Sequence, residues 1–258
     1  MEWQEIAGNW VVVPPRPRAV VHFLGGAFVA AAPQLTYRSL LEFLAEEGYA
    51  VVATPFVNTF DHGAIARQVL AAFTRAMDEL YDKQFKRRYL PIYGVGHSMG
   101  CKLHLLIGSL YPQERAGNLL ISFNNYPAKR SIPFLEQFVQ LAPTPINVEF
   151  TPSPEETNEL ILRNYQVRRN LLVKFKHDDI DQTRSLHDVM LQRCPDLTSL
   201  QILKGNHLTP LGQDFKWQAG EVFTPFDALG QLMRQELNRD FNQLKQTIRL
   251  WLNPFAKA

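Results

Sequence analysis

The sequence predicts one large α/β domain in which a mostly parallel sheet carries helices on both faces. Hydrophobic residues make up 46% of the 258 residues, which is enough for a well-buried core. Short apolar runs alternate with segments of helical spacing along most of the chain, and this alternation is typical of parallel sheets covered by helices. The alternation is interrupted once, between residues 127 and 166, which indicates an insertion rather than a second domain.

The predicted elements follow one another in a regular order. The chain opens with a hairpin over 2–15 that turns at Gly8-Asn9. The later strands are predicted from apolar runs at 18–26, 49–56, 90–95, 117–123, 169–175 and 197–205. The predicted helices lie at 34–48, at 64–83, after residue 98 as far as Tyr111, at about 181–193 and from Thr224 onward. Gly48 ends the first of these helices and Asp61 caps the second.

The interrupting segment is rich in proline and contains no clear core strand. Ser153-Pro154-Glu155-Glu156 has the form of a capping box with proline at the first helical position, which predicts a helix start. A second short helix is predicted from Ser131 onward. The expected division of the chain is therefore a core and an insertion, with bounds 1–126 and 167–258 for the core and 127–166 for the insertion.

Ser98 lies at the junction between a predicted strand and a predicted helix, within Gly96-His97-Ser98-Met99-Gly100. This pattern fits G-x-S-x-G, in which a nucleophilic serine is exposed on a strained turn. A turn of small residues without chemistry gives the same five letters. The pattern alone is therefore a weak signal, and its context decides between the two interpretations.

A nucleophilic serine needs a base to take its proton and an acid to orient that base. The strand at 169–175 is followed by Asp178 and Asp179, and the strand at 197–205 is followed by His207. The carboxyl ends of parallel strands meet at one edge of the sheet, so these side chains are expected near Ser98. Asp178 or Asp179 is the candidate acid and His207 the candidate base. The chain order Ser, Asp, His is that of the α/β-hydrolase arrangement.

Acyl chemistry also needs N–H groups that hold an oxyanion. One is expected from Met99, directly after the serine, and another from the loop after the strand at 18–26. That loop reads LGGAF, whose glycines allow close approach of the backbone to a ligand. Gly26 and Ala27 are the candidate donors, and Phe28 and His97 are candidate substrate contacts.

The insertion at 127–166 carries more apolar side chains than an idle surface loop needs, among them Leu135 and Phe138. We therefore expect a lid over Ser98 that excludes water and lines an apolar acyl pocket. Leu135 and Phe138 are its candidate substrate contacts.

Several neighbouring residues have plainer interpretations. His177, Asp178, Asp179 and Asp181 can be read as a metal site, but no matching cluster occurs elsewhere in the sequence, and no metal is expected. His22 is interpreted as a satisfied buried histidine and Cys101 as a packing residue between helix and sheet. Lys102 is expected to be solvated.

The composition argues against several other classes of protein. The formal net charge of +2 comes without a nucleic-acid-binding motif, so no nucleic-acid partner is expected. Two cysteines without a C-x-x-C pair suggest neither a disulfide framework nor a thiolate zinc site. No apolar run reaches membrane-spanning length, and no signal-peptide pattern opens the chain. A reducing, cytoplasmic compartment is therefore expected.

The stretches GVGHSMGCKLHLLIGSLYP and KFKHDDIDQ resemble the α/β-hydrolase superfamily, and within it a branch of unknown function from cyanobacteria and plastids. The resemblance covers nearly the whole chain and implies the α/β-hydrolase fold, a Ser-Asp-His triad, and a plastid or cyanobacterial cytosol as its location. The superfamily's spacing at this strand end favours Asp178 over Asp179 as the acid. The chain departs from lipases and esterases at Leu24, where those enzymes have the histidine of H-G-G-G, and at Cys101, where many relatives have glycine.

These observations predict a serine hydrolase that cleaves a carboxylic ester or thioester of an apolar acyl group. Ser98 would attack, His207 would carry the proton, and no cofactor is needed. An acyltransferase with the same triad remains an alternative, because an alcohol or amine can resolve the same acyl-enzyme. A catalytically silent binding protein on this fold is a second alternative.

Overall fold

The computed structural model describes residues 2–86, 89–131, 149–212 and 234–253. In these residues one eight-stranded sheet forms the centre, with the strand order β1-β2-β4-β3-β5-β6-β7-β8. The strands are β1 (Gln4–Ile6), β2 (Asn9–Val12), β3 (Ala19–Leu24), β4 (Tyr49–Ala53), β5 (Ile92–His97), β6 (Gly117–Ile121), β7 (Asn170–Phe175) and β8 (Thr198–Leu203). Strands β3 to β8 are parallel to their neighbours, whereas the hairpin β1-β2 joins the edge of β4 in antiparallel pairing.

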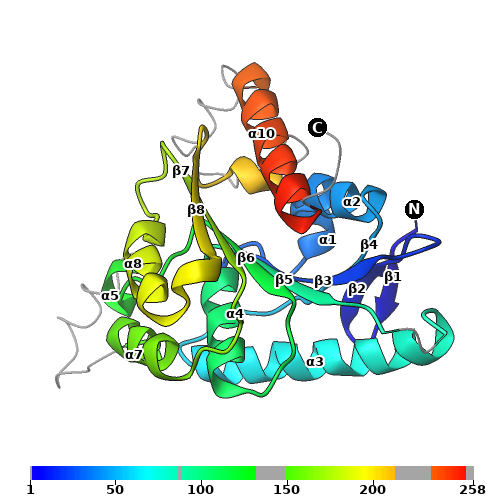
Figure 1. Ribbon diagram of the computed structural model, residues 1–258, viewed down its shortest axis with the longest axis horizontal. Coiled ribbons are helices and arrows are strands. Elements are labelled where there is room, and N and C mark those ends of the chain that lie inside the picture. The colour runs from blue at the N-terminus through cyan, green and yellow to red at the C-terminus, as the bar shows by residue number, and fades with distance from the viewer. Residues whose placement is uncertain (1, 87–88, 132–148, 213–233, 254–258) are drawn as a thin grey trace, which may run out of the picture.

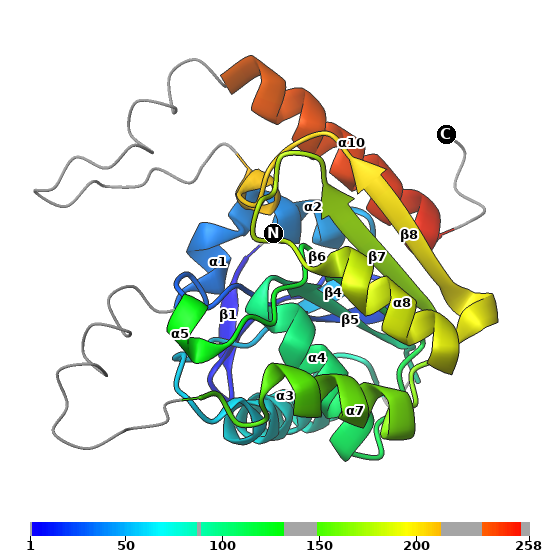
Figure 2. The ribbon, with the colours of Figure 1, turned by 90° about the vertical axis from the view of Figure 1, so that its left-hand side faces the viewer.

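Helices cover both faces of the sheet (Figure 1). Their bounds are α1 (Pro33–Thr36), α2 (Arg38–Glu46), α3 (His62–Lys83), α4 (Met99–Leu110), α5 (Ala128–Ser131), α7 (Pro154–Asn164), α8 (Thr183–Arg193) and α10 (Arg234–Leu252). Two short 3₁₀ turns, Pro195–Leu197 and Thr209–Leu211, flank β8. Figure 2, turned by 90°, shows α2 and α10 on one side of the strands and α3, α4 and α7 on the other.

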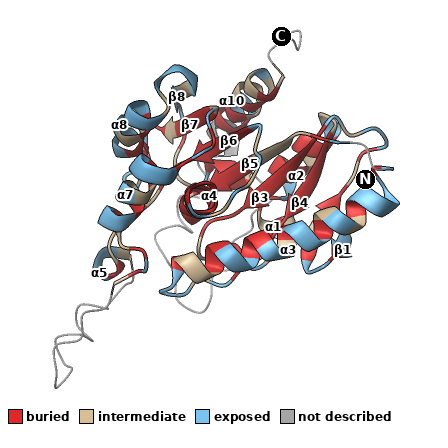
Figure 3. Ribbon diagram, turned by 60° about the horizontal axis from the view of Figure 1, so that its bottom comes forward, coloured by how far each residue is buried: buried red, intermediate tan, exposed pale blue. Residues whose placement is uncertain are grey.

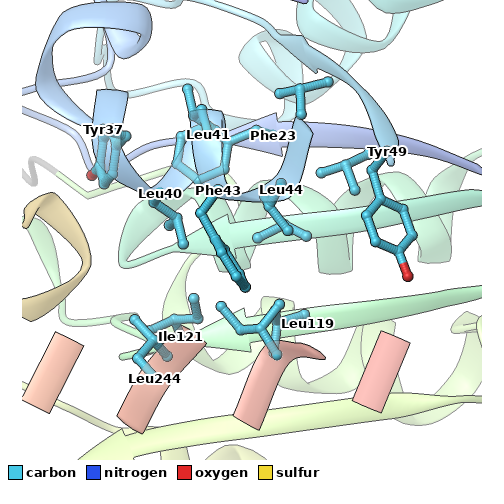
Figure 4. Packing of buried hydrophobic residues seen from close by; sticks show 14 of the residues in the cluster. Phe23, Tyr37, Leu40, Leu41, Phe43, Leu44, Tyr49, Leu119, Ile121 and Leu244 are labelled. Atoms are coloured by element: carbon cyan, nitrogen blue, oxygen red, sulfur yellow. The ribbon is translucent and has the colours of Figure 1, made fainter. Parts of the chain in front are cut away.

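The core is divided by the sheet, because successive side chains of a strand point to opposite faces. In β3, Val21 and Phe23 join the cluster under α2 and α10, while Val20 and Leu24 join the clusters under α3 and α4. Figure 4 shows part of the first cluster, to which α2 contributes Phe43. Figure 3 shows the strands buried and the outward side of α3 exposed. This division confirms the predicted parallel sheet with helices on both faces.

Local signals placed several boundaries correctly. The Asp61 side chain accepts a hydrogen bond from the N–H of Ala64 at 2.7 Å and caps α3. Ser153 and Glu156 form the predicted capping box, in which each side chain accepts a hydrogen bond from the other's backbone N–H. The closing helix is described from Arg234, so its predicted start at Thr224 lies outside the described residues.

The predicted lid segment is described at 127–131 and 149–166 only, so its role as a lid stays a prediction. Its last part, α7, packs between α4 and α8 in the helical layer of the core. Ile161 of α7 is buried there together with Leu105 and Leu186. Among the helices of the described ranges, none combines the length and apolar character needed to cross a membrane.

Candidate active site

Ser98 lies at the carboxyl end of β5, directly before the first residue of α4. Its backbone has φ 55° and ψ −118°, a conformation that residues other than glycine rarely adopt. The N–H of Ser98 donates to the carbonyl of Ile121 in the neighbouring strand at 2.9 Å, which holds the turn in place. Strain of this kind persists only where the surrounding structure enforces it, and it is common at catalytic turns.

The glycines on either side of Ser98 are required by close backbone contacts. A Cβ atom on Gly96 would lie 2.7 Å from the backbone of Gly100 and Cys101. A Cβ atom on Gly100 would lie 2.0 Å from the carbonyl oxygen of Leu24 in β3. The start of α4 therefore sits directly on the β3 strand end, and this contact brings the loop after β3 beside Ser98.

Asp178 and His207 come from the loops after β7 and β8 and meet at the same edge of the sheet. The Nδ1 atom of His207 lies 2.8 Å from Oδ2 of Asp178. Oδ1 of Asp178 accepts a further hydrogen bond from the N–H of Ile180 at 3.2 Å. The Asp178 side chain is buried, whereas the His207 ring keeps contact with solvent.

The charge state of Asp178 follows from these contacts. Burial alone would raise the pKa of this carboxyl, but the hydrogen bond and electrostatic interaction with His207, together with the hydrogen bond from the N–H of Ile180, outweigh burial, and the pKa lies below its usual value. Asp178 is therefore ionised and can only accept hydrogen bonds. Asp179 is exposed, and Asp181 accepts hydrogen bonds from Lys174 and from the backbone of Thr183. The structure brings Asp178, and neither of the other two aspartates, to His207.

The loop after β3 supplies backbone N–H groups beside Ser98. A Cβ atom on Gly26 would lie 3.4 Å from Cβ of Ser98, so the two backbones are close. The N–H of Gly26 donates to the Tyr37 hydroxyl at 2.8 Å and is therefore engaged. Within the described residues no such hydrogen bond occupies the N–H of Ala27 or of Met99. Of the predicted donors, Met99 and Ala27 thus have no acceptor for their N–H groups in the part of the chain that the structure describes.

The predicted substrate contacts fall into three groups. Phe28 is 83% exposed on the loop after β3. His97 is buried, and its ring nitrogens contact the Tyr37 hydroxyl at 2.7 Å and the His207 carbonyl at 2.9 Å, which leaves neither for a substrate. His97 thus serves as a packing and turn residue at the elbow. Leu135 and Phe138 lie outside the described residues.

The structure also locates the residues that were interpreted as buried or as packing residues. His22 is buried between Thr54 and Arg115, and Cys101 is buried with its sulfur 3.2 Å from the carbonyls of Gly96 and Ile121. Burial raises the pKa of the Cys101 thiol well above its usual value, so it is not a reactive thiolate. Over the described ranges, no group of three or more His, Cys, Asp and Glu side chains is placed to hold a metal ion.

The prediction for Lys102 was wrong. This lysine is only 1% exposed, and its Nζ donates to the carbonyl of Pro152 at 3.0 Å. Burial lowers the pKa of Lys102 to about 8, although Glu149 and other nearby glutamates oppose the shift. Tyr37 was missed altogether, because its contacts with Gly26 and His97 depend on tertiary packing and leave no local signal in the sequence.

Comparison with solved structures shows the α/β-hydrolase fold. The esterase Pf2001 of Pyrococcus furiosus superimposes with a TM-score of 0.61 at 14% identity, over 99% of this chain and 91% of that one. Carboxyl esterase 2 of the fungus Tuber melanosporum gives 0.54 at 16% identity, over 90% and 82%. A fluorophosphonate-binding serine hydrolase of Staphylococcus aureus gives 0.53 at 14% identity, over 91% and 92%. At these identities the likeness establishes the fold alone.

No curated protein matches the sequence. A family model described as "Protein of unknown function (DUF1350)" matches residues 2–254, which is nearly the whole chain. The predicted resemblance to a branch of unknown function within the α/β-hydrolase superfamily is thereby confirmed: this chain belongs to the DUF1350 family and has the α/β-hydrolase fold.

Proposed function

We propose that this protein is a serine hydrolase that cleaves carboxylic esters or thioesters through an acyl-enzyme on Ser98. The observation that carries the proposal is the strained Ser98 turn at the same sheet edge as the 2.8 Å hydrogen bond between Asp178 and His207. A packing turn needs neither the positive φ nor a buried, ionised carboxylate held against a histidine.

The roles follow from hydrogen-bonding capacity. Because the Asp178 carboxylate can only accept, Nδ1 of neutral His207 carries the ring proton and Nε2 is left as a base. Nε2 accepts the Ser98 hydroxyl proton while Oγ bonds to the acyl carbon. The same proton is then given to the leaving alcohol or thiol as its bond to the acyl carbon breaks. Water then attacks the acyl carbon and loses a proton to Nε2. His207 returns that proton to Oγ of Ser98 as the bond between Oγ and the acyl carbon breaks, and the carboxylic acid is released.

The negative oxygen of each tetrahedral intermediate would be held by the N–H groups of Met99 and Ala27. Met99 is the first residue of α4, where N–H groups have no acceptor within the helix and carry the positive end of the helix dipole. Such a donor is worth about 3 kcal/mol of transition-state stabilisation. This assignment replaces Gly26, whose N–H is bound to Tyr37.

Exposed apolar side chains support an apolar acyl group. Phe28 and Val57, in the loops after β3 and β4, are 83% and 74% exposed, and Leu208 follows His207. Loops that leave the carboxyl ends of parallel strands gather at one edge of the sheet, which is the edge of Ser98. An apolar substrate would cover these side chains on binding.

The test is reaction with a fluorophosphonate probe, which phosphonylates an activated serine with loss of fluoride. We expect labelling of the folded protein at Ser98, identified by mass spectrometry of the labelled peptide, and none in Ser98→Ala. Absence of labelling in the folded wild type would overturn the proposal and favour a silent binding protein. Product analysis with 4-nitrophenyl octanoate and added glycerol then separates hydrolysis from acyl transfer: free octanoate indicates a hydrolase and glyceryl octanoate an acyltransferase.

A further inference from the structure

A buried chain of hydrogen bonds crosses the site behind Ser98. It runs from the N–H of Gly26 to the Tyr37 hydroxyl at 2.8 Å, then to Nδ1 of His97 at 2.7 Å, and from Nε2 of His97 to the backbone carbonyl of His207 at 2.9 Å. The rings of His97 and His207 have centroids 4.8 Å apart. The chain thus joins the loop after β3, the Ser98 turn and the loop after β8.

The two ends of this chain fix the position of every proton within it. The amide of Gly26 can only donate, so the Tyr37 oxygen accepts there and turns its own hydrogen toward Nδ1 of His97. The carbonyl of His207 can only accept, so Nε2 of His97 carries the ring proton. Burial holds the pKa of His97 well below its usual value, and the neighbouring His207 lowers it further, so the ring is neutral. One tautomer of His97 satisfies all three contacts.

We propose that Tyr37 and His97 are positioning residues, which together set the location of the catalytic imidazole of His207 and of the oxyanion loop relative to Ser98. This inference rests on the proposed function of Ser98 and His207. Tyr37 and His97 touch no reacting atom; they act through the backbone of His207 and of Gly26.

The position of His207 in the fold explains why its backbone needs a contact that holds it in place. His207 comes from the loop after β8, which is the last strand in the sheet order and pairs along one side with β7. Asp178 holds the His207 ring through Nδ1, and His97 holds the main chain of the same residue. With both contacts in place, the position and the rotation of the imidazole are fixed, as a proton transfer within hydrogen-bond reach requires.

The rival explanation is that Tyr37 is an ordinary packed tyrosine whose loss only lowers stability. Tyr165 provides a matched control, since it is equally buried and its hydroxyl also makes two hydrogen bonds, from Nδ2 of Asn118 and to Oδ1 of Asn170, both at 2.7 Å. Asn118 and Asn170 stand near the amino ends of β6 and β7, opposite the edge of Ser98. Tyr37→Phe and Tyr165→Phe therefore remove the same groups from two ends of one sheet.

The kinetic experiment uses 4-nitrophenyl octanoate, with kcat expressed per active site titrated by fluorophosphonate so that unfolded protein does not count. We expect Tyr37→Phe to lower kcat roughly tenfold, the effect of about one lost hydrogen bond, with KM nearly unchanged. Tyr165→Phe should lower Tm by about as much as Tyr37→Phe does, because each loses a buried hydroxyl with two hydrogen bonds. It should not lower kcat. His97→Gln can offer an acceptor to Tyr37 and a donor to His207, so it should keep more activity than His97→Leu, which offers neither.

A spectroscopic measurement tests the same inference without an activity assay, and its first readout comes from the wild-type protein. The ¹⁵N chemical shifts of the His97 ring distinguish its two neutral tautomers. We expect the Nε2–H tautomer in the wild type and in both variants, because the His207 carbonyl requires a donor at Nε2. In Tyr37→Phe alone, Nδ1 loses its hydrogen-bond donor, and its ¹⁵N resonance should move to the position of a ring nitrogen without a hydrogen bond.

The outcomes separate the two proposals. An Nδ1–H tautomer in the wild type, equal kcat in Tyr37→Phe and Tyr165→Phe, or equal activity of His97→Gln and His97→Leu would each overturn the positioning role. Failure of the wild type to react with fluorophosphonate would instead overturn the proposed function. The positioning role would then be judged on the Nδ1–H proton resonance of His207, which Tyr37→Phe should broaden and Tyr165→Phe should not.

Discussion

In the proposed mechanism, replacing Asp178 by asparagine removes the group that keeps Nε2 of His207 available as a base. The carboxylate accepts the Nδ1–H of His207 at 2.8 Å and has no exposed side-chain surface. An asparagine of the same shape can turn its NH₂ toward Nδ1, which would place the ring proton on Nε2. Nε2 could then no longer take the proton of Ser98, and the imidazolium formed during the reaction would lose its counter-charge.

The magnitude follows from the interaction that is lost. A hydrogen bond to a charged group contributes about 1.5 to 3 kcal/mol, and 2.7 kcal/mol corresponds to a hundredfold change in rate. The asparagine also favours the wrong tautomer of His207, which lowers the rate further. We therefore expect kcat of Asp178→Asn to fall by about 10² to 10⁴. The neighbouring Asp179 is exposed, so Asp179→Asn serves as the matched control and should change kcat only a few-fold.

The assay is steady-state hydrolysis of 4-nitrophenyl octanoate by both variants, with folding checked by circular dichroism. The reverse ranking of the two variants would make Asp179 the acid. Equal and small effects in two folded variants would refute the claim that an aspartate orients His207 in this protein.

Three further predictions address the turn, the buried lysine and the substrate. Gly100→Ala places a Cβ atom 2.0 Å from the carbonyl oxygen of Leu24, so it should destabilise the protein by about 3 kcal/mol in urea unfolding; an unchanged unfolding midpoint would contradict the contact. The pKa of Lys102 is lowered from 10.5 to about 8, so the unfolded chain binds more protons between these values, and the free energy of unfolding should rise with pH across that window by up to about 3 kcal/mol. Lys102→Met should lack this rise, and parallel pH curves for the two proteins would disprove it. In a panel of nitrophenyl esters from acetyl to palmitoyl, turnover should be highest on medium or long acyl chains, and Phe28→Ala should raise KM up to about tenfold for octanoate but not for acetate; best turnover on acetate would argue against an apolar acyl site.

The sequence predicted what local rules control. Strand and helix order, the Asp61 cap and the Ser153 capping box each depend on residues within one turn of chain, and each was found in the structure. The strand order was not predicted, because it depends on which strands pair across long separations. The bounds 127–166 of the insertion stay a prediction, and α7, which lies within them, packs with α4 and α8.

In the candidate site, too, the residues that follow from local sequence patterns could be predicted, and those that depend on tertiary packing could not. Ser98, Asp178 and His207 could be singled out because each follows a predicted strand, and parallel strands bring such positions together without further information. Tyr37 and Lys102 could not, since tyrosine is intermediate in burial and lysine is mostly exposed, and only the packing of other elements buries the two here. The Lys102 ammonium donates to the carbonyl of Pro152, fifty residues away in the chain.

The positive φ of Ser98 and the close packing of Gly96 and Gly100 are each supported by contacts nearby. The Ser98 N–H is held by Ile121, and Gly100 rests on Leu24, so the strained turn is tied to strands on both sides of β5. A turn that served packing alone would relax into an ordinary strand–helix joint and would not need this support. Strain that is maintained from two directions, beside a buried carboxylate paired with a histidine, supports the proposed role of Ser98 as the nucleophile.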